Sequence, residues 1–234
     1  MGREEAVKKA VGKADVYELL SYLFAYPDER VAKGLVDGAI AEDARACLVD
    51  AGVPEGRVRT VGDALDAWLG DDACEVLAVL RITYSSLYLA PGGHTPIFPY
   101  ESAYLHVERG LSGAPALFRT PVTIDVERCM REAGVVAKNG RTEPCDSVYE
   151  EFEFLSYLHA QLADALNSDN TDQVALWSAH IRAFGGEHAL AWMLSFMRRT
   201  QELAADTPYE AFAALGMAAL DPLSCSVERT EVSA

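Results

Sequence analysis

The chain has 234 residues, half of them hydrophobic, and it carries 36 Asp and Glu against 20 Lys and Arg, for a formal net charge of −16 at pH 7. This length allows one large domain with a substantial core. The negative charge argues against nucleic acid and anionic membrane surfaces as partners, and it favours a cationic ligand such as a basic peptide. The ordinary alternative is that the acidity only keeps the protein soluble.

The cysteines and the apolar segments indicate the compartment. The five cysteines are odd in number and form no Cys-x-x-Cys pair, which predicts reduced thiols and argues against a disulfide framework or a zinc site. The segment Met1–Glu5 is followed by no apolar region, and no run of about 18 apolar residues occurs. We therefore expect a cytoplasmic chain that is neither exported by itself nor inserted into a membrane.

Apolar residues recur at helical spacing from the start of the chain. The first predicted helix runs from about Glu4 to Tyr26 and ends before Pro27. Shorter helices follow to about Gly70, separated by glycines and a proline. The pair Asp71-Asp72 then caps a longer predicted helix, which reaches a break at Ala90.

The proline- and glycine-bearing segment 91–99 can continue neither a helix nor a central strand. It is predicted to be a hinge loop between an N-terminal and a C-terminal set of helices. Exchange of one set between protomers would occur there, so both a monomer and a domain-exchanged dimer are left open.

The C-terminal half continues the helical pattern. Pro121 opens a predicted helix to about Ala133, and the polar stretch 138–142 is expected to be an exposed connection. Breaks are expected at 167–170 and at Gly185–Gly186, and Thr207–Pro208 should begin the last helix.

The predicted fold class is all-α, a single globular helical domain over 1–220 followed by a polar, mobile tail over 221–234. Only Val122–Val126 alternates in the way that a strand would, which is too little for a sheet.

The most distinctive segment is a Glu-Pro-x-Asp turn, Glu143 to Asp146, which opens directly into a long apolar helix reaching Leu166. Asp146 is predicted to be the N-cap of this helix, because its carboxylate can accept free N–H groups of the first turn. Glu150 and Glu151 add negative charge near the same helix end. The turn is more acidic than a cap requires, so it is either a solvated helix start or a site for a cation.

A second unusual segment, Pro99-Tyr100-Glu101-Ser102-Ala103-Tyr104-Leu105, lies at the end of the predicted hinge. With Leu87-Tyr88 before it and the Glu-Pro-x-Asp turn after it, this order of motifs resembles the TorD/DmsD/NarJ family of redox-enzyme maturation chaperones. The resemblance covers most of residues 74–220 and is weakest in the first third, where only the helix ending Leu19-Leu20-x-Tyr22-Leu23-Phe24 is similar. It includes an order of C-terminal aromatic and histidine residues that comprises Trp177, His180, Phe184, Trp192, Phe196, Tyr209 and Phe212.

One departure from the family pattern concerns the partner. The family's Asp is usually followed by His, whereas Asp146 is followed by Ser147. A serine can still cap a helix, but it removes a titratable aromatic donor from the expected binding site. Which partner is recognised is therefore left open.

The resemblance implies a TorD-like helical bundle that acts as a cytoplasmic, non-catalytic chaperone. Such a chaperone binds the twin-arginine signal peptide, or the N-terminal segment, of the catalytic subunit of a molybdenum or tungsten oxidoreductase, and assists cofactor insertion and assembly before export. A twin-arginine peptide carries two guanidinium groups and an apolar segment, so its receptor should offer carboxylates beside an aromatic groove.

These requirements assign roles to the residues of the two motifs. Glu143, Asp146 and Glu150 or Glu151 are expected to meet the arginines. Tyr88, Tyr100 and Tyr104 are expected to meet the apolar part, with Glu101 and Ser102 positioning the loop. The full predicted peptide-binding set is Glu143, Pro144, Asp146, Ser147, Glu150, Glu151, Tyr84, Tyr88, Pro99, Tyr100, Glu101, Ser102 and Tyr104.

No cofactor, metal ligand or catalytic residue is predicted. None of the five histidines has a Glu three residues before it, as a di-iron bundle requires, and the zinc-protease, nucleotide-binding and hydrolase motifs are absent. Cys145, His159 and His180 are interpreted as structural residues. Two alternatives stay open: a helical hydrolase or nucleotide-binding enzyme with an unrecognised carboxylate site, and a general helical adaptor without a redox client.

Overall fold

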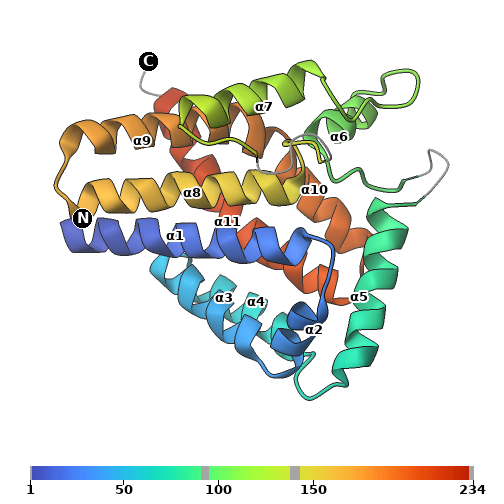
Figure 1. Cartoon of the computed structure of the whole chain (residues 1–234). Helices are drawn as coiled ribbons and strands as arrows, with labels where there is room; N and C mark the ends of the chain where they lie inside the picture. Colours follow the sequence, from blue (N-terminus) through green and yellow to red (C-terminus); the bar gives the residue numbers. More distant parts are fainter. Residues whose placement is uncertain (1, 91–94, 138–142, 232–234) are drawn as a thin grey trace.

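The computed structural model describes residues 2–90, 95–137 and 143–231, with side chains as far as Asp221. Every regular element within these ranges is helical, so the predicted all-α class is confirmed (Figure 1). In chain order the elements are α1 (Arg3–Phe24), α2 (Glu29–Val36), α3 (Ala39–Asp50), α4 (Glu55–Asp66), α5 (Ala73–Tyr88), α6 (Glu101–Glu108), α7 (Pro121–Glu132), α8 (Val148–Asn167), α9 (Thr171–Phe184), the π-helical turn η1 (Gly185–Ala189), α10 (Leu190–Leu203) and α11 (Pro208–Glu231).

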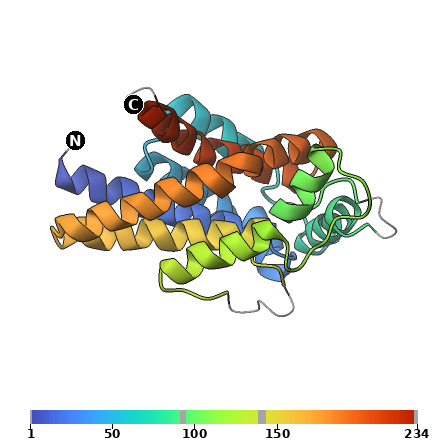
Figure 2. The ribbon, with the colours of Figure 1, turned by 90° about the horizontal axis from the view of Figure 1, so that it is seen from above.

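Helices α1 and α8 form the centre of the bundle, where they lie side by side and run in opposite directions (Figures 1 and 2). Helix α3 packs against α1, and α4 packs against α3 and α11. Helix α9 covers α8, and α10 pairs with α11. The first and last thirds of the chain therefore share one core.

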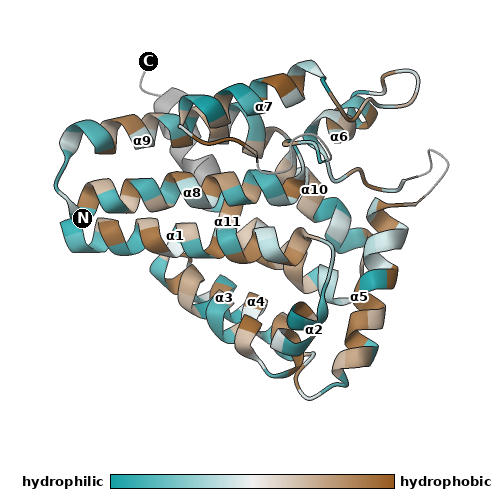
Figure 3. Cartoon of the chain, viewed as in Figure 1, coloured by the Kyte–Doolittle hydropathy of each residue, from teal (hydrophilic) through white to brown (hydrophobic). Residues whose placement is uncertain are grey.

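The core between these helices is rich in aromatic rings. Phe24 of α1 contacts Phe152 of α8, Phe196 of α10 and Tyr209 of α11, with ring centroids 5.9–6.2 Å apart. All four side chains are fully buried, which stabilises the fold by about 1.5–3 kcal/mol for each large apolar residue. Figure 3 shows hydrophobic and hydrophilic residues alternating along most helices, as expected when one face of each helix packs inward.

Several predicted helix boundaries are confirmed. Helix α1 ends three residues before Pro27, and the Asp72 carboxylate caps α5 by accepting from the backbone N–H groups of Cys74 and Glu75. Pro121 is the first residue of α7, whose N-cap is Thr120.

One prediction about secondary structure is wrong. Gly185–Gly186 does not break the chain, because η1 joins α9 directly to α10 and burial of Phe184 on one side outweighs the low helix propensity of glycine. Val122–Val126, the one candidate strand, lies within α7, in agreement with the helix predicted from Pro121 to about Ala133. Helix α11 continues to Glu231, so it includes most of the stretch 221–234 that the sequence predicts as a polar tail.

The two predicted connections lie partly outside the described residues. Positions 91–94 of the predicted hinge and the whole stretch 138–142 belong there. The described part of the hinge folds back on α5, because the Ile97 N–H donates to the Leu87 carbonyl at 3.1 Å. Among the described helices, none combines the length and the apolar character that crossing a membrane would need.

Candidate functional site

The two motifs that stand apart in the sequence meet in the structure. Tyr100 and Ser147 form an isolated antiparallel bridge. The Val148 N–H donates to the Pro99 carbonyl at 2.9 Å, and the Glu101 N–H donates to the Asp146 carbonyl at 2.8 Å. The acidic turn is therefore fixed against the start of α6 by backbone hydrogen bonds.

Asp146 caps a different helix from the one predicted. The N-cap of α8 is Ser147, whose hydroxyl accepts from the Glu150 N–H at 3.4 Å. The Asp146 carboxylate instead accepts from the Ser102 N–H at 3.0 Å, in the first turn of α6. The N-cap of α6, Tyr100, makes no side-chain cap of its own, so Asp146 supplies it from 44 residues away.

The Asp146 side chain is fully buried. Burial raises its pKa, and the bonds from Ser102 act in the opposite direction. In this arrangement Asp146 is a structural acceptor, and a peptide on the surface does not reach it. Ser102 is itself 9% exposed, and its backbone position agrees with the predicted role in holding the loop.

Glu101 and His188 form a buried pair beneath the turn. Glu101 is 2% exposed, and its Oε2 accepts from His188 Nδ1 at 2.8 Å. The other ring nitrogen, Nε2, lies 3.2 Å from Asp125 Oδ2 on α7. Burial acts to lower the pKa of His188, but its bonds to Cys129 and Glu101 outweigh burial and raise the pKa to about 10.

Glu151 lies inside the core, where its side chain is fully buried. The Trp192 Nε1–H donates to Glu151 Oε2 at 3.0 Å. Burial raises the pKa of Glu151 well above its ordinary value, and repulsion from Glu101 adds to the effect. Because it is fully buried and bonded to Trp192, Glu151 is not open to a ligand on the surface.

Two of the predicted tyrosines belong to the core. Tyr88 stacks on Phe196 at 5.6 Å and shares a 2.9 Å hydrogen bond with the Thr200 hydroxyl. Tyr84 packs edge-on against Tyr88 at 5.1 Å. Both tyrosines are less than 10% exposed, so they support the site from below.

Tyr104 is buried but borders open space. Its hydroxyl shares a 2.7 Å hydrogen bond with the Ser195 hydroxyl, and its ring lines a hollow of about 400 Å³ beside the end of the predicted hinge. Arg198 and Arg199 also line this hollow. Glu108 and Glu202 line it as well, so its charged residues balance and the hollow lacks the net negative charge that would favour arginine side chains.

Glu143 and Glu150 are the members of the acidic turn nearest to solvent. Glu143 is half-buried and accepts from the Tyr100 hydroxyl at 3.1 Å. Glu150 is 8% exposed; burial raises its pKa, and repulsion from Glu153 and Glu143 raises it further. No described cation forms a salt bridge with these three carboxylates.

An acidic groove of about 650 Å³ opens next to this turn, between α1, α3 and α8. Every charged residue that lines it is acidic, and the rest of the lining includes two tyrosines and a leucine. The lining residues are Asp15, Glu18, Leu19, Ser21, Tyr22, Ala25, Asp43, Cys47, Tyr149 and Glu153.

The acidic residues of the groove raise the pKa of their neighbours. Burial raises the pKa of Asp15, and repulsion from Glu18 and Asp50 adds to it. Burial likewise raises the pKa of the Cys47 thiol to about 11, with Asp15 and Asp43 as the next causes. A bound cation would relieve this repulsion.

A smaller apolar hollow of about 200 Å³ lies on the other side of α8. Glu153 lines both spaces, so one ridge of α8 joins the acidic groove to an apolar surface. The hollow is lined by Met130, Val135, Val136, Ala137, Glu150, Glu153, Phe154 and Tyr157.

Cys145 and His159, both interpreted from the sequence as structural residues, are buried in the structure. Cys145 is buried, and its thiol donates to the Thr123 carbonyl at 3.4 Å; burial and the neighbouring Asp146 raise its pKa to about 12. His159 packs on the Tyr17 ring at 5.5 Å, and its nitrogens have no hydrogen-bond partner among the described residues. Burial holds the pKa of His159 well below its ordinary value, so it is neutral.

The family model described as "nitrate reductase delta subunit" matches residues 55–198, which is more than half of the chain. The chain belongs to the nitrate reductase delta subunit family. This confirms the resemblance drawn from the motifs. Members of this family are maturation chaperones of molybdoenzymes, and membership supports a chaperone role in place of a catalytic one. The chain matches no curated protein.

The nitrate reductase delta subunit match covers one part of the site better than another. It includes the start of α6, the acidic turn and the α8 wall of the groove. The opposite wall, on α1 and α3, lies before residue 55. The acidic residues of that wall, Asp15, Glu18 and Asp43, stand outside the sequence motifs, and the net charge was the only signal that pointed to them.

Proposed function

We propose that the chain binds the twin-arginine signal peptide, or the corresponding N-terminal segment, of the catalytic subunit of a molybdenum or tungsten oxidoreductase. In the cytoplasm it holds that segment while the cofactor is inserted and the enzyme is assembled, before export. The observation that carries this proposal is the acidic groove, which has aromatic walls, no lining cation and an apolar hollow beside it.

Arginine is the cation that fits this groove best. A guanidinium group binds carboxylates through paired hydrogen bonds and also stacks on aromatic rings. The groove supplies carboxylates from α1, α3 and α8, with Tyr22 and Tyr149 between them. Two adjacent arginines of a leader can therefore contact different helices at once.

The apolar part of the peptide would occupy the hollow beside Phe154 and Tyr157. Glu150 and Glu153 lie at the boundary between the two spaces, where the charged and apolar parts of the peptide meet. This order of charge followed by apolar surface matches the order within a twin-arginine leader.

In this proposal some residues of the predicted peptide-binding set contact the peptide, and the others hold those residues in place. Glu143 and Glu150, with Tyr100 holding Glu143, stand at the rim and meet the peptide. Asp146 and Glu151 lie buried beneath the turn and stabilise it without touching the peptide. The other supports are Pro144 and Ser147 in the turn, Pro99, Glu101 and Ser102 at the start of α6, and Tyr84, Tyr88 and Tyr104 in the adjoining core.

A peptide series with and without arginine tests the proposal. We would titrate a leader peptide with two adjacent arginines into the full chain by calorimetry, beside the same peptide with both arginines replaced by glutamine. Each charge-assisted contact contributes about 1.5–3 kcal/mol, so losing one arginine should weaken binding roughly ten- to a hundredfold, and losing both should weaken it more. Equal affinity for the two peptides would contradict arginine recognition and would favour a general helical adaptor.

The same function can also serve a client enzyme that has no signal peptide. Its N-terminal segment would use the apolar hollow more than the acidic groove. Affinity would then depend on the apolar residues of the segment and little on salt, which the same titration at two salt concentrations distinguishes.

A further inference from the structure

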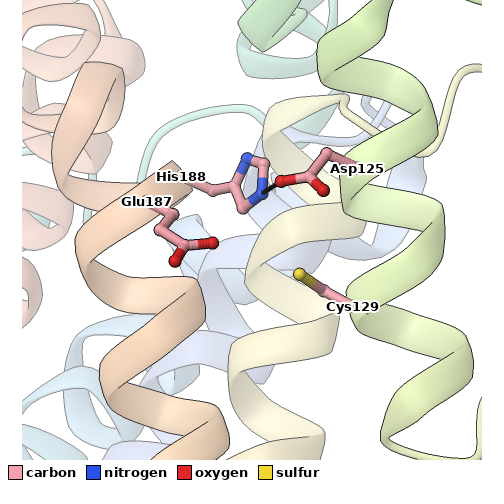
Figure 4. A group of neighbouring side chains, drawn as sticks. All are labelled: Asp125, Cys129, Glu187 and His188. Atoms are coloured by element: carbon pink, nitrogen blue, oxygen red, sulfur yellow. Dashed lines mark hydrogen bonds and ion pairs between the residues drawn. The ribbon is translucent and has the colours of Figure 1, made fainter.

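Four side chains able to bind a metal ion meet between α7 and η1. Asp125 and Cys129 lie one turn apart on α7, and Glu187 and His188 are neighbours in η1. One ligand atom from each lies within 4.8 Å of those of the other three. Figure 4 shows the four side chains arranged around a common space between the two helices.

The π-helical turn explains how two consecutive residues can take part. In a regular α-helix adjacent residues point in directions about 100° apart, whereas a π-turn widens the helix locally, and such turns occur frequently at functional sites. The widened segment in this chain is Gly185–Ala189, and it contains both Glu187 and His188.

Two of the four ligands are already oriented by outer partners. Glu101 accepts from His188 Nδ1 at 2.8 Å, which directs Nε2 toward Asp125. Arg128 donates to Asp125 Oδ1 at 2.8 Å, which leaves Oδ2 facing His188 Nε2 at 3.2 Å. A carboxylate behind the histidine and a bonded carboxylate ligand are the outer arrangement found around protein metal ions.

We propose that Asp125, Cys129, Glu187 and His188 form a Zn²⁺ site. One thiolate, one imidazole and two carboxylates are ligand types that zinc accepts, and four protein ligands are typical of a structural site. The ion and Arg128 would offset part of the negative charge of the ligands and of Glu101. Arg128 pairs with Asp125 and Glu132 and lies 4.0 Å from Glu187. Binding needs a small contraction, because zinc–ligand distances are about 2.0–2.3 Å.

The ion would fasten α7 to the α9–α10 helix pair and, through Glu101, to the start of α6. In the metal-free chain the hydrogen bond between His188 and Asp125 links the same two elements, and zinc would replace that bond. The proposal revises the prediction of no metal site. That prediction tested spacing within one helix, whereas this cluster draws its ligands from two elements 58 or more residues apart.

Zinc titration of the full chain tests the proposal. Chain freed of metal with a chelator would be titrated with zinc sulfate against a zinc-sensitive dye, and we expect one ion per chain. Cys129→Ser and His188→Gln should each weaken binding by more than the roughly 10- to 100-fold expected for Glu101→Gln, which removes only an outer partner. Cys74→Ser, an exposed cysteine outside the cluster, is the matched control and should bind as wild type does.

Cobalt identifies the ligands independently. Co²⁺ in the same site should give a thiolate-to-metal charge-transfer band that Cys129→Ser abolishes and Cys74→Ser retains. Circular dichroism of the metal-free variants checks folding, and Cys129→Ser keeps the size of the side chain. The proposal is overturned if wild type holds no zinc, or if Cys129→Ser, folded normally, binds zinc as tightly as Cys74→Ser and so reveals an adventitious ion only.

Discussion

The carboxylates of the acidic turn and those of the neighbouring groove differ in what surrounds them. In and beneath the turn, Asp146 and Glu151 are fully buried and accept hydrogen bonds from a backbone N–H and an indole N–H. In the groove, Asp15 and Glu18 face other acids across open space. The buried carboxyl groups have protein partners and therefore maintain the fold, whereas the groove carboxyl groups are open to a ligand.

The largest effect is expected from breaking the buried ion pair beneath the turn. Glu101→Ala leaves the His188 charge buried with only Asp125 beside it, and losing one partner of a buried pair costs about 3–5 kcal/mol. Denaturant unfolding of metal-free protein measures this loss. Glu75→Gln, an exposed carboxylate on α5, is the control, and an equal change in both variants would show that the pair contributes nothing.

A smaller loss of stability is expected from removing the cap that Asp146, in the acidic turn, supplies to α6. Asp146→Ala leaves the Ser102 N–H without an acceptor and should cost about 1–3 kcal/mol in unfolding free energy. Asp146→Asn keeps an acceptor oxygen and should lose less than about 1 kcal/mol. If Asn and Ala destabilise equally, the charge of Asp146 matters more than its hydrogen bond.

Glu151→Gln tests the role of the buried carboxyl group through the pH dependence of stability. Because the folded-state pKa of Glu151 is raised, folded protein binds more protons than unfolded protein above the ordinary pKa, and wild-type stability falls as pH rises through the folded-state pKa. Glutamine accepts the Trp192 bond without titrating, so the variant should lose less stability between pH 5 and 9. The wild type should lose about 1.4 kcal/mol more unfolding free energy than the variant for each unit by which the pKa of Glu151 is raised. Parallel stability curves for the two proteins would contradict a raised pKa of Glu151.

The smallest effect on stability is expected in the groove. Asp15→Asn removes a carboxylate whose pKa is raised by burial and by its acidic neighbours, so the variant should be within about 0.5 kcal/mol of wild type, on the more stable side. Thermal unfolding at neutral pH measures the shift. A clear destabilisation would mean that Asp15 has a structural partner and is not held for a ligand.

The sequence predicts local features of this molecule well. Helical spacing located α1, the Asp72 cap of α5 and the Pro121 start of α7, because each depends on neighbouring residues only. The order of motifs also identified the family. These features need no knowledge of how distant segments meet.

The sequence misplaces features that depend on distant contacts. Asp146 and Ser147 are both good N-caps, and only the approach of Ser102 from α6 decides that Asp146 caps the other helix. The acidic residues of the α1 and α3 wall of the groove belong to no sequence motif. The approach of His188 to Asp125 cannot be read from spacing either, because the π-turn that places His188 contains the pair of glycines that predicted a break.

The most direct test of the account compares groove and turn in one binding experiment. The double-arginine leader peptide would be titrated calorimetrically into wild type, Asp15→Asn/Glu153→Gln, Asp146→Asn and the control Glu75→Gln, at low and high salt. Charges on the surface are screened over about 8–10 Å at physiological ionic strength, so wild-type affinity should fall with salt. The groove double variant should bind at least about a hundredfold more weakly and depend less on salt, while Asp146→Asn and Glu75→Gln bind as wild type does. Wild-type affinity in the groove double variant together with weakened binding in a folded Asp146→Asn would contradict the account and place the arginine contacts in the turn.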